Sequence, residues 1–216
     1  EHVDITRPDT DVHSHSLGAL ASRLTYVAGN AVKNAATEAA RQLLEAAAEQ
    51  FNRPVEELTI INGEIGPHSG SETDFKPVGA VVRANLYKPG GQPIVGIGNF
   101  DNPSEFPDHN RYGNESGAYN FIAQTAEVEV DPATGEVKLL EIASAVDCGT
   151  VINPATATGQ VQGGVMQGVG FAMTEYFDWW NGMPTDPQLK DYPIPGAAMV
   201  PKLHVAFADS YEPSGP

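Results

Sequence analysis

The sequence predicts an α+β fold, in which a mixed sheet and hairpins pack with two or three helices. Two observations carry this prediction: helical patterns cover residues 32–51 and 153–175, and a β-hairpin pattern covers residues 121–146 between them. Strands and helices do not alternate regularly along the chain, so a parallel α/β architecture is not predicted. With 216 residues, of which 41% are hydrophobic, the chain can bury a sizeable core.

The first helical pattern is the clearest. Apolar residues between 32 and 51 recur at spacings of three and four, and charged residues occupy the rest of the helical wheel. Pro54 ends this helix. A weaker helix is expected at residues 75–86, with Pro77 near its beginning, where proline is tolerated.

Short strands are expected on either side of this second helix. A β-branched strand at residues 59–61 turns at Asn62-Gly63 into a returning strand at residues 64–65. Residues 93–100 are interpreted as a further strand. The irregular segment that follows, residues 101–116, is longer than loops without a function usually are.

The hairpin pattern is the strongest β signal. Its arms, residues 121–130 and 136–146, flank the turn Asp131-Pro-Ala-Thr-Gly135, which has proline early and glycine where φ must be positive. In the first arm alanine and valine alternate with glutamate, which predicts one buried and one solvated face. The remaining expectations are a polar loop at residues 1–22, a loop at 184–195 and a final strand at 203–207.

The acidic composition argues against several classes of partner. The net charge is -16 with only 12 Lys and Arg, and such a surface repels phosphate backbones and anionic membranes. No apolar run approaches the ~20 residues that cross a bilayer, and residues 1–4 do not resemble a signal peptide. The single cysteine, Cys148, permits no internal disulfide and is interpreted as a small buried residue. We therefore expect a cytoplasmic protein that binds neither nucleic acid nor membrane.

The second helical pattern begins at Asn153-Pro154, a cap residue followed by proline, and contains glycines at 159, 163, 164, 168 and 170. Each interior glycine costs about 1 kcal/mol relative to alanine, so the set costs on the order of 4–5 kcal/mol. Such a cost is retained where something approaches the helix backbone closely. The approaching group is either the hairpin, packed tightly on the helix, or a polar ligand that contacts the amide of Gln160. A membrane GxxxG pair is excluded, because glutamine and glutamate side chains interrupt the apolar surface.

This helix and the residues before it carry a series of specific motifs: VDCG at 146–149, INP at 152–154, GQVQGG at 159–164 and QGVGFAMTE at 167–175. The series resembles the cofactor-binding subunit of the xanthine dehydrogenase/aldehyde oxidase family of molybdenum hydroxylases. The hairpin, DYPIP at 191–195 and SRLTYVAGNAVKNAA at 22–36 also resemble that subunit, in the expected order and over nearly the whole chain. The loop at 101–116 is similar to that of members acting on hydroxybenzoyl-CoA, which favours an aromatic substrate.

The resemblance implies a molybdenum–pyranopterin cofactor, either molybdopterin or its cytosine dinucleotide, whose metal is held by the dithiolene of the pterin rather than by protein ligands. The cofactor-contacting segments of the family match five residues of this chain, which are Leu20, Ala21, Ser22, Arg23 and Gln160. Loop N–H groups that lead into a helix suit anionic oxygens; an ordinary capped helix start is the alternative. Arg23 either contacts the pterin or forms an ion pair within the domain.

The resemblance further implies an oxidoreductase that hydroxylates an aromatic, N-heterocyclic or aldehyde carbon of a small-molecule substrate, with water as the oxygen source. Each iron–sulfur cluster normally takes four cysteine thiolates and this chain has only Cys148, so iron–sulfur and FAD centres are expected on partner subunits. His13 and His15 with Asp9 and Asp11 have no third ligand at a diagnostic spacing, so no metal site is predicted there.

The family's catalytic glutamate lies in a GAKG-x-GE motif, which is expected just after Pro216, so no catalytic residue is predicted in this chain and Glu212 is not that base. We therefore expect residues 1–216 to be a partial molybdopterin-binding domain, the C-terminal part of a large subunit truncated at both ends. Such a piece alone is expected neither to retain molybdenum nor to turn over. The alternative is a non-catalytic split subunit or assembly domain that completes the pocket on a partner chain. Phe106, His109 and Tyr112 are expected near the substrate channel, and Trp179-Trp180 at a surface or subunit contact.

Overall fold

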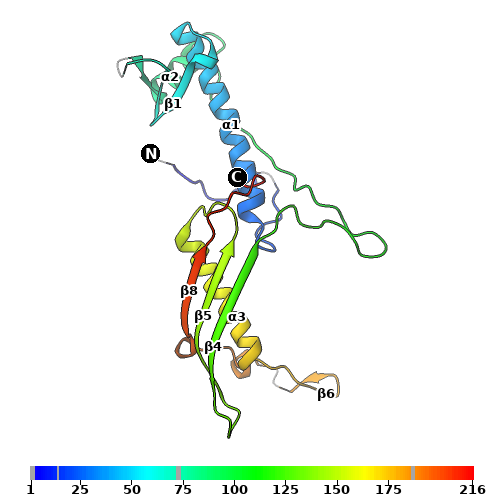
Figure 1. Cartoon of the computed structure of the whole chain (residues 1–216). Coiled ribbons are helices and arrows are strands. Elements are labelled where there is room, and N and C mark those ends of the chain that lie inside the picture. The colour runs from blue at the N-terminus through cyan, green and yellow to red at the C-terminus, as the bar shows by residue number, and fades with distance from the viewer. Residues whose placement is uncertain (1–2, 14, 72–73, 186–187) are drawn as a thin grey trace. The chain divides into compact units, whose positions relative to one another are not determined.

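The computed structural model describes residues 3–13, 15–71, 74–185 and 188–216, and the chain divides into two compact units. The first unit contains the residues up to Gly117 together with Ser214–Pro216, and the second contains Ala118–Pro213. Helices and small mixed sheets occur in the chain without regular alternation (Figure 1), which confirms the predicted α+β class. Parts of the loops predicted at 1–22 and 184–195, namely residues 1–2, 14 and 186–187, lie outside the described residues.

In the first unit a long helix packs on a small antiparallel sheet and a second helix. The elements are α1 (Leu24–Phe51), the 3-10 turn Val55–Glu57, β1 (Leu58–Ile61), β2 (Glu64–Pro67), β3 (Lys76–Pro77) and α2 (Val78–Tyr87). The predicted pairing of β1 with β2 across Asn62-Gly63 is confirmed. Their shared core consists of Leu43, Ala46, Ala47, Leu58, Ile65 and Val81.

Helix α1 begins eight residues before the start that the periodic pattern indicated. Leu24 is 45% exposed and Val32 is 68% exposed, so the early turns of α1 lie outside this core. Asn30 is buried instead, and its side-chain amide donates to the backbone oxygens of Tyr26 and Ser214, at 2.8 and 2.9 Å. A polar contact with residues far along the chain therefore accompanies the extension of the helix.

The strand predicted at residues 93–100 is wrong: this segment is extended but pairs with no strand among the described residues. The amide of Gln42 on α1 bonds both the N–H and the C=O of Val95, at 3.1 and 2.9 Å. Asn34 likewise donates to the backbone oxygen of Asn99 at 2.8 Å. Side-chain amides of a helix therefore replace the ladder that a neighbouring strand would supply.

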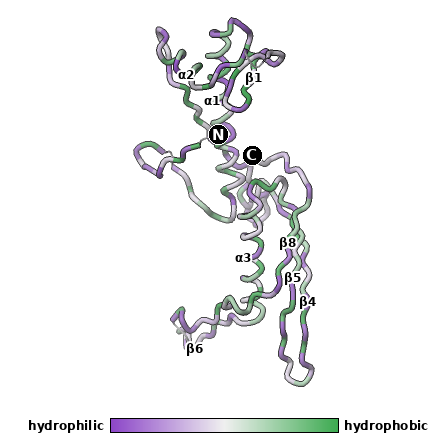
Figure 2. The backbone as a smooth tube through the Cα atoms, turned by 90° about the vertical axis from the view of Figure 1, so that its left-hand side faces the viewer, coloured by the Kyte–Doolittle hydropathy of each residue, from purple (hydrophilic) through white to green (hydrophobic). Residues whose placement is uncertain are grey.

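The second unit is a three-stranded sheet with a helix on one face. Antiparallel β4 (Phe121–Val130) and β5 (Val137–Asp147) form the predicted hairpin, and β8 (Lys202–Phe207) pairs parallel to β5. The three strands run side by side in both ribbon views (Figure 2). Helix α3 (Pro154–Met173) covers one face, and its core contacts are Ile142, Val165 and Val169 with Leu139, Val161, Met166 and Leu203.

The buried face predicted for the first arm of the hairpin is wrong, because all ten residues of β4 are exposed. β4 is an edge strand, and the core beneath α3 is centred on β5, where Ile142, Ser144 and Val146 are buried. The alternating pattern of β4 therefore marks a face that this unit does not bury by itself. The turn is as predicted, with φ +76° at Gly135.

The connection from α3 to β8 contains elements that the sequence did not predict. β6 (Trp179–Trp180) and β7 (Met183–Pro184) form a minimal hairpin about Asn181-Gly182, whose φ angles are 50° and 78°. Two 3-10 turns, Leu189–Asp191 and Ala197–Met199, follow. Trp179 and Trp180 are both exposed, in agreement with the predicted surface position.

Candidate functional site

The turn before α1 has an unusual backbone. The N–H of Arg23 donates to the carbonyl of Leu20 at 3.0 Å, and the two residues between them, Ala21 and Ser22, have φ angles of +48° and +56°. A left-handed conformation costs a non-glycine residue roughly 1–2 kcal/mol. Backbone strain of this kind persists where the surroundings fix it, and it clusters at ligand clamps and active sites. Positive φ angles also occur at Asn52, Asn62, Arg111 and Asn181, so the contact of the Leu20–Arg23 turn with a cofactor stays a prediction.

The first turn of α1 is open at its N-terminus. Arg23 is the N-cap, and among the described residues no side chain caps the helix and no acidic residue lies in its first turn. Leading N–H groups without partners form the partial positive end of the helix dipole, which favours anions. Arg23 adds a cation beside them, and it makes no salt bridge with the residues that the structure describes. The intradomain ion pair considered for Arg23 is therefore not formed there.

Helix α3 begins differently, as its sequence predicted. The side-chain oxygen of Asn153 accepts hydrogen bonds from the N–H groups of Ala155 and Thr156, at 3.1 and 3.2 Å, and Pro154 occupies the first turn. The cap satisfies donors that would otherwise face an anion. The start of α3 is therefore complete without a ligand.

The glycines of α3 lie on an open face. A Cβ atom added at Gly159, Gly163, Gly164 or Gly168 would have no heavy atom within 4 Å. Tight packing against the hairpin, one of the two interpretations of these glycines, is thus wrong for all four. Gly170 alone of the α3 glycines is covered, since its Cβ would lie 2.0 Å from a carboxylate oxygen of Glu175.

Gln160 is exposed on the same open face. Residues three, four and seven positions apart share one side of a helix, so Gly163, Gly164 and Gln167 are its neighbours there. The opposite side carries Val165, which is buried against the sheet. Two amides flanking exposed helix backbone can donate to and accept from a planar polar ring. Ser22 belongs to the first unit and Gln160 to the second, so their convergence on one cofactor stays a prediction.

The VDCG motif shapes the turn at which β5 ends. One carboxylate oxygen of Asp147 accepts from the hydroxyl of Ser210 at 2.5 Å and from the N–H of Gly149 at 3.3 Å. Gly149 has a φ of +69°, and a Cβ there would lie 2.6 Å from the Cβ of Glu212. Because parallel strands end at the same edge of a sheet, the segments after β5 and β8 meet here. This motif therefore has a structural role, and Glu212 contributes to the same turn.

Sequence reasoning missed a contact between the end of α3 and the segment after it. The hydroxyl of Tyr192 donates to the carboxylate of Glu175 at 2.8 Å. This hydrogen bond, with burial as a smaller cause, raises the pKa of Tyr192 above its ordinary value. Glu175 lies in the motif QGVGFAMTE and Tyr192 in the motif DYPIP. The only signal in the sequence was that both residues lie in motifs quoted above.

The N-terminal histidines do not form a metal site among the described residues, where no group of three or more His, Cys, Asp or Glu side chains comes together. A ring nitrogen of His13 lies 3.0 Å from the N–H of Asp9, inside a local turn. Cys148 is a half-buried free thiol.

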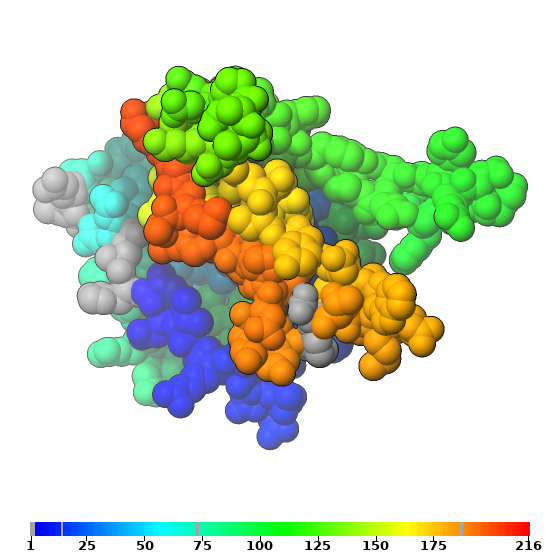
Figure 3. Space-filling model, turned by 90° about the horizontal axis from the view of Figure 1, so that it is seen from below, coloured from blue at the N-terminus to red at the C-terminus, as the bar shows by residue number. Residues whose placement is uncertain are grey.

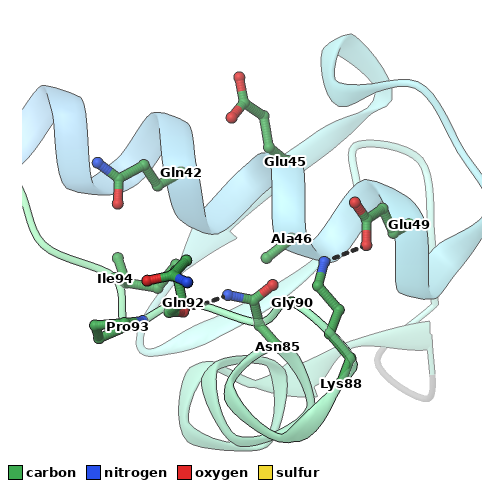
Figure 4. A pocket seen from close by; sticks show the side chains of 10 residues that line it. All are labelled: Gln42, Glu45, Ala46, Glu49, Asn85, Lys88, Gly90, Gln92, Pro93 and Ile94. Atoms are coloured by element: carbon green, nitrogen blue, oxygen red, sulfur yellow. Dashed lines mark hydrogen bonds and ion pairs between the residues drawn. The ribbon is translucent and has the colours of Figure 1, made fainter.

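A small hollow of about 240 Å³ lies between α1, α2 and residues 88–94 (Figure 4). Its polar groups bond one another: Lys88 pairs with Glu49, and the amide of Asn85 donates to the backbone oxygen of Gln92 at 2.8 Å. These contacts attach the loop after α2 to α1. The hollow therefore has a structural explanation and is not assigned a ligand.

Comparison with known proteins gives the class first. Residues 1–201 match the family described as the molybdopterin cofactor-binding domain, and the chain belongs to that family. Among curated relatives, it is 31% identical to the putative xanthine dehydrogenase molybdenum-binding subunit of Escherichia coli, over 97% of this chain and 27% of that protein. It is 28% identical to the 6-hydroxypseudooxynicotine dehydrogenase complex subunit gamma of Paenarthrobacter nicotinovorans, over 100% of this chain and 26% of that protein.

Solved structures agree with these matches. A Cu,Mo-CO dehydrogenase in its carbon monoxide reduced state superimposes with a TM-score of 0.81 at 26% identity, covering 96% of this chain and 25% of that one. Quinoline 2-oxidoreductase of Pseudomonas putida 86, with a TM-score of 0.77 at 23% identity, has the same fold over 95% of this chain and 25% of its own. The chain spans about a quarter of the length of these relatives. In the part of the chain that the structure describes, no helix is long and apolar enough to cross a membrane.

Proposed function

We propose that this chain supplies part of the cofactor-binding surface of a molybdenum hydroxylase. The observation that carries the proposal is the strained turn at Ala21 and Ser22, which leads into the uncapped start of α1. Backbone N–H groups at an open helix start suit an anionic oxygen or phosphate, the chemistry that a pyranopterin cofactor offers. The donor set of this chain fits such a group.

In this proposal each segment has one task. The Leu20–Arg23 turn holds the polar end of the cofactor with backbone N–H groups, the hydroxyl of Ser22 and the guanidinium of Arg23. Ala21 allows close approach because its side chain is a single methyl group. Gln160 contacts the pterin ring from the glycine face of α3. When bound, the molybdenum centre supplies hydroxylation by water-derived oxygen.

The whole protein is proposed to be an oxidoreductase that acts on an aromatic, N-heterocyclic or aldehyde carbon of a small molecule. One relative is named as the gamma subunit of a dehydrogenase complex and another as the large subunit of nicotine 6-hydroxylase, which supports partner subunits in general. Iron–sulfur and FAD centres on those partners, and a cytoplasmic location, are proposed on the basis of the single cysteine and the family. The remainder of the molybdenum subunit is proposed to complete the pocket.

The test uses the full-length subunit produced with its partner subunits. Ser22→Pro removes one N–H and forces φ to about -65°, and Gln160→Leu removes the amide. Both variants are expected to lower bound molybdenum and pterin several-fold, measured by elemental analysis and by fluorescence of the oxidised pterin. Gln188→Leu, an exposed glutamine outside α3, is the control and is expected to leave both contents unchanged. Wild-type contents in both test variants would contradict the proposal.

A further inference from the structure

Residues 102–117 form an arm whose two ends meet beside the first turn of α1. A Cβ atom added at Gly117 would lie 2.1 Å from the side-chain oxygen of Asn102 and 2.7 Å from the hydroxyl of Tyr26. The backbone at Gly117 therefore passes close to these side chains. The ring of Tyr26 also packs edge-on against Phe100, with centroids 5.3 Å apart. The base of the arm is thus closed and fixed to α1.

Within the arm, hydrogen bonds define a fixed shape. The N–H of Glu105 donates to the carbonyl of Asn114 at 2.6 Å, and the N–H of Asp108 to that of Tyr112 at 2.8 Å. At the tip, one carboxylate oxygen of Asp108 accepts from the N–H groups of Asn110 and Tyr112, at 2.7 and 3.0 Å. A loop held in this way loses little conformational entropy when it binds.

The arm exposes its aromatic rings. Phe106 is 94% exposed and Tyr112 is 78% exposed, and the arm appears as a projection in the ribbon and space-filling views (Figures 1 and 3). Hydrogen bonds rather than apolar packing therefore hold the arm, and its rings remain free for another surface. Aromatic side chains on pre-organised loops are frequent anchors of protein interfaces.

The charge of the arm indicates which surface it fits. Residues 102–117 contain three acidic side chains, Glu105, Asp108 and Glu115, and one Lys or Arg side chain, Arg111. A second copy of this chain, with a net charge of -16, would repel such an arm. The complementary surface is an apolar pocket with a basic rim on a different polypeptide.

We propose that the arm formed by residues 102–117 docks onto a partner subunit of the complex, with Phe106 and Tyr112 as anchors in an apolar pocket that has a basic rim. This inference rests on the proposed function, because it assumes a multisubunit enzyme. It assigns to the arm a role in assembly rather than at the substrate channel.

The test compares partner binding by the full-length subunit and its variants. Phe106→Ser combined with Tyr112→Ser is expected to weaken binding of the partner subunit at least tenfold, measured by calorimetry and by co-elution in size-exclusion chromatography. Tyr87→Ser on α2 is the matched control, because Tyr87 is 80% exposed and lies outside the arm. The control is expected to bind like the wild type.

A second pair of variants tests the charge. Glu105→Gln with Glu115→Gln keeps the backbone of the arm and removes two charges, and it is expected to reduce the salt dependence of the association rate. Unchanged binding by the aromatic variant would overturn the proposal. So would a lower melting temperature of the unpartnered subunit with partner affinity unchanged, since the arm would then pack within its own subunit. A change of self-association seen by sedimentation, without loss of the partner, would overturn it as well. Molybdenum content is measured in parallel, so that failure of cofactor binding is separated from failure of docking.

Discussion

Helix α1 lacks a side-chain cap at its start among the described residues, whereas helix α3 is capped at its start and has an uncovered flank. The start of α1 has two left-handed residues before it and no side-chain cap among the described residues, whereas Asn153 caps the start of α3 with two hydrogen bonds. The flanks are reversed: an extended segment lies close against α1, and four glycines on α3 face open space. A ligand would bind where the described residues leave helix N–H groups uncapped or a helix flank uncovered. The comparison is consistent with the proposal that the start of α1 and the flank of α3 each offer a surface to the cofactor.

The largest effect is expected for Gly96→Ala on the closed flank of α1. The new Cβ would lie 1.9 Å from the backbone oxygen of Ala35, and two hydrogen bonds between Gln42 and the backbone of Val95 hold this segment against α1. Overpacking of this kind costs typically about 1–3 kcal/mol, and the backbone contact places this variant at the upper end. Urea unfolding of the chain measures the loss, and a loss below about 1 kcal/mol would contradict close packing of this flank.

Asn153→Ala tests the capped start of α3. Removal of a side-chain cap costs about 1 kcal/mol, and faster hydrogen exchange is expected at the amides of Ala155 and Thr156. Ser22→Ala is the comparison at α1, where no cap is lost and the free energy of unfolding is expected to stay unchanged. Equal losses for the two variants would mean that the two helix starts do not differ.

Gly163→Ala tests the open flank of α3 and is expected to have the opposite sign to Gly96→Ala. The methyl group meets nothing within 4 Å, so higher helix propensity should stabilise the chain by up to about 1 kcal/mol. In the full-length subunit the same methyl group is expected to lower cofactor content, because it occupies space next to Gln160. Stabilisation without any loss of cofactor would remove this face from the site.

The smallest effect is expected for Ala21→Gly at the strained turn. Glycine adopts a positive φ without steric cost, but it loses more backbone entropy on folding, so a net gain of roughly 0.5 kcal/mol is expected. Gly18, which already has a φ of +77°, gives a control in Gly18→Ala, where a loss is expected. Thermal unfolding measures the stability of both variants. A lower stability of Ala21→Gly would contradict backbone strain at Ala21.

Local chemistry explains which features the sequence could predict. The cap at Asn153, the turn ending at Gly135 and the β1–β2 turn each depend on a few adjacent residues, and all three were predictable. The Leu20–Arg23 segment was proposed through its motif alone, and the left-handed backbone at Ala21 and Ser22 was not predicted. Residues 93–100 were interpreted as a strand because isoleucine, valine and phenylalanine are common in strands. Their partners are amides on α1 more than 50 positions earlier in the chain, which no local pattern contains.

The early turns of α1 depend on the last residues of the chain. The amide of Asn30 bonds the carbonyl of Ser214, 184 positions later, and a Cβ on Gly29 would lie 2.9 Å from Pro216. At a synthesis rate of 5–20 residues per second, roughly 10–40 s separate the appearance of these partners on a ribosome. During that interval the second unit is made while the first lacks its closing contacts. In a nascent chain the early turns of α1 therefore stay without these contacts until Ser214 has been synthesised.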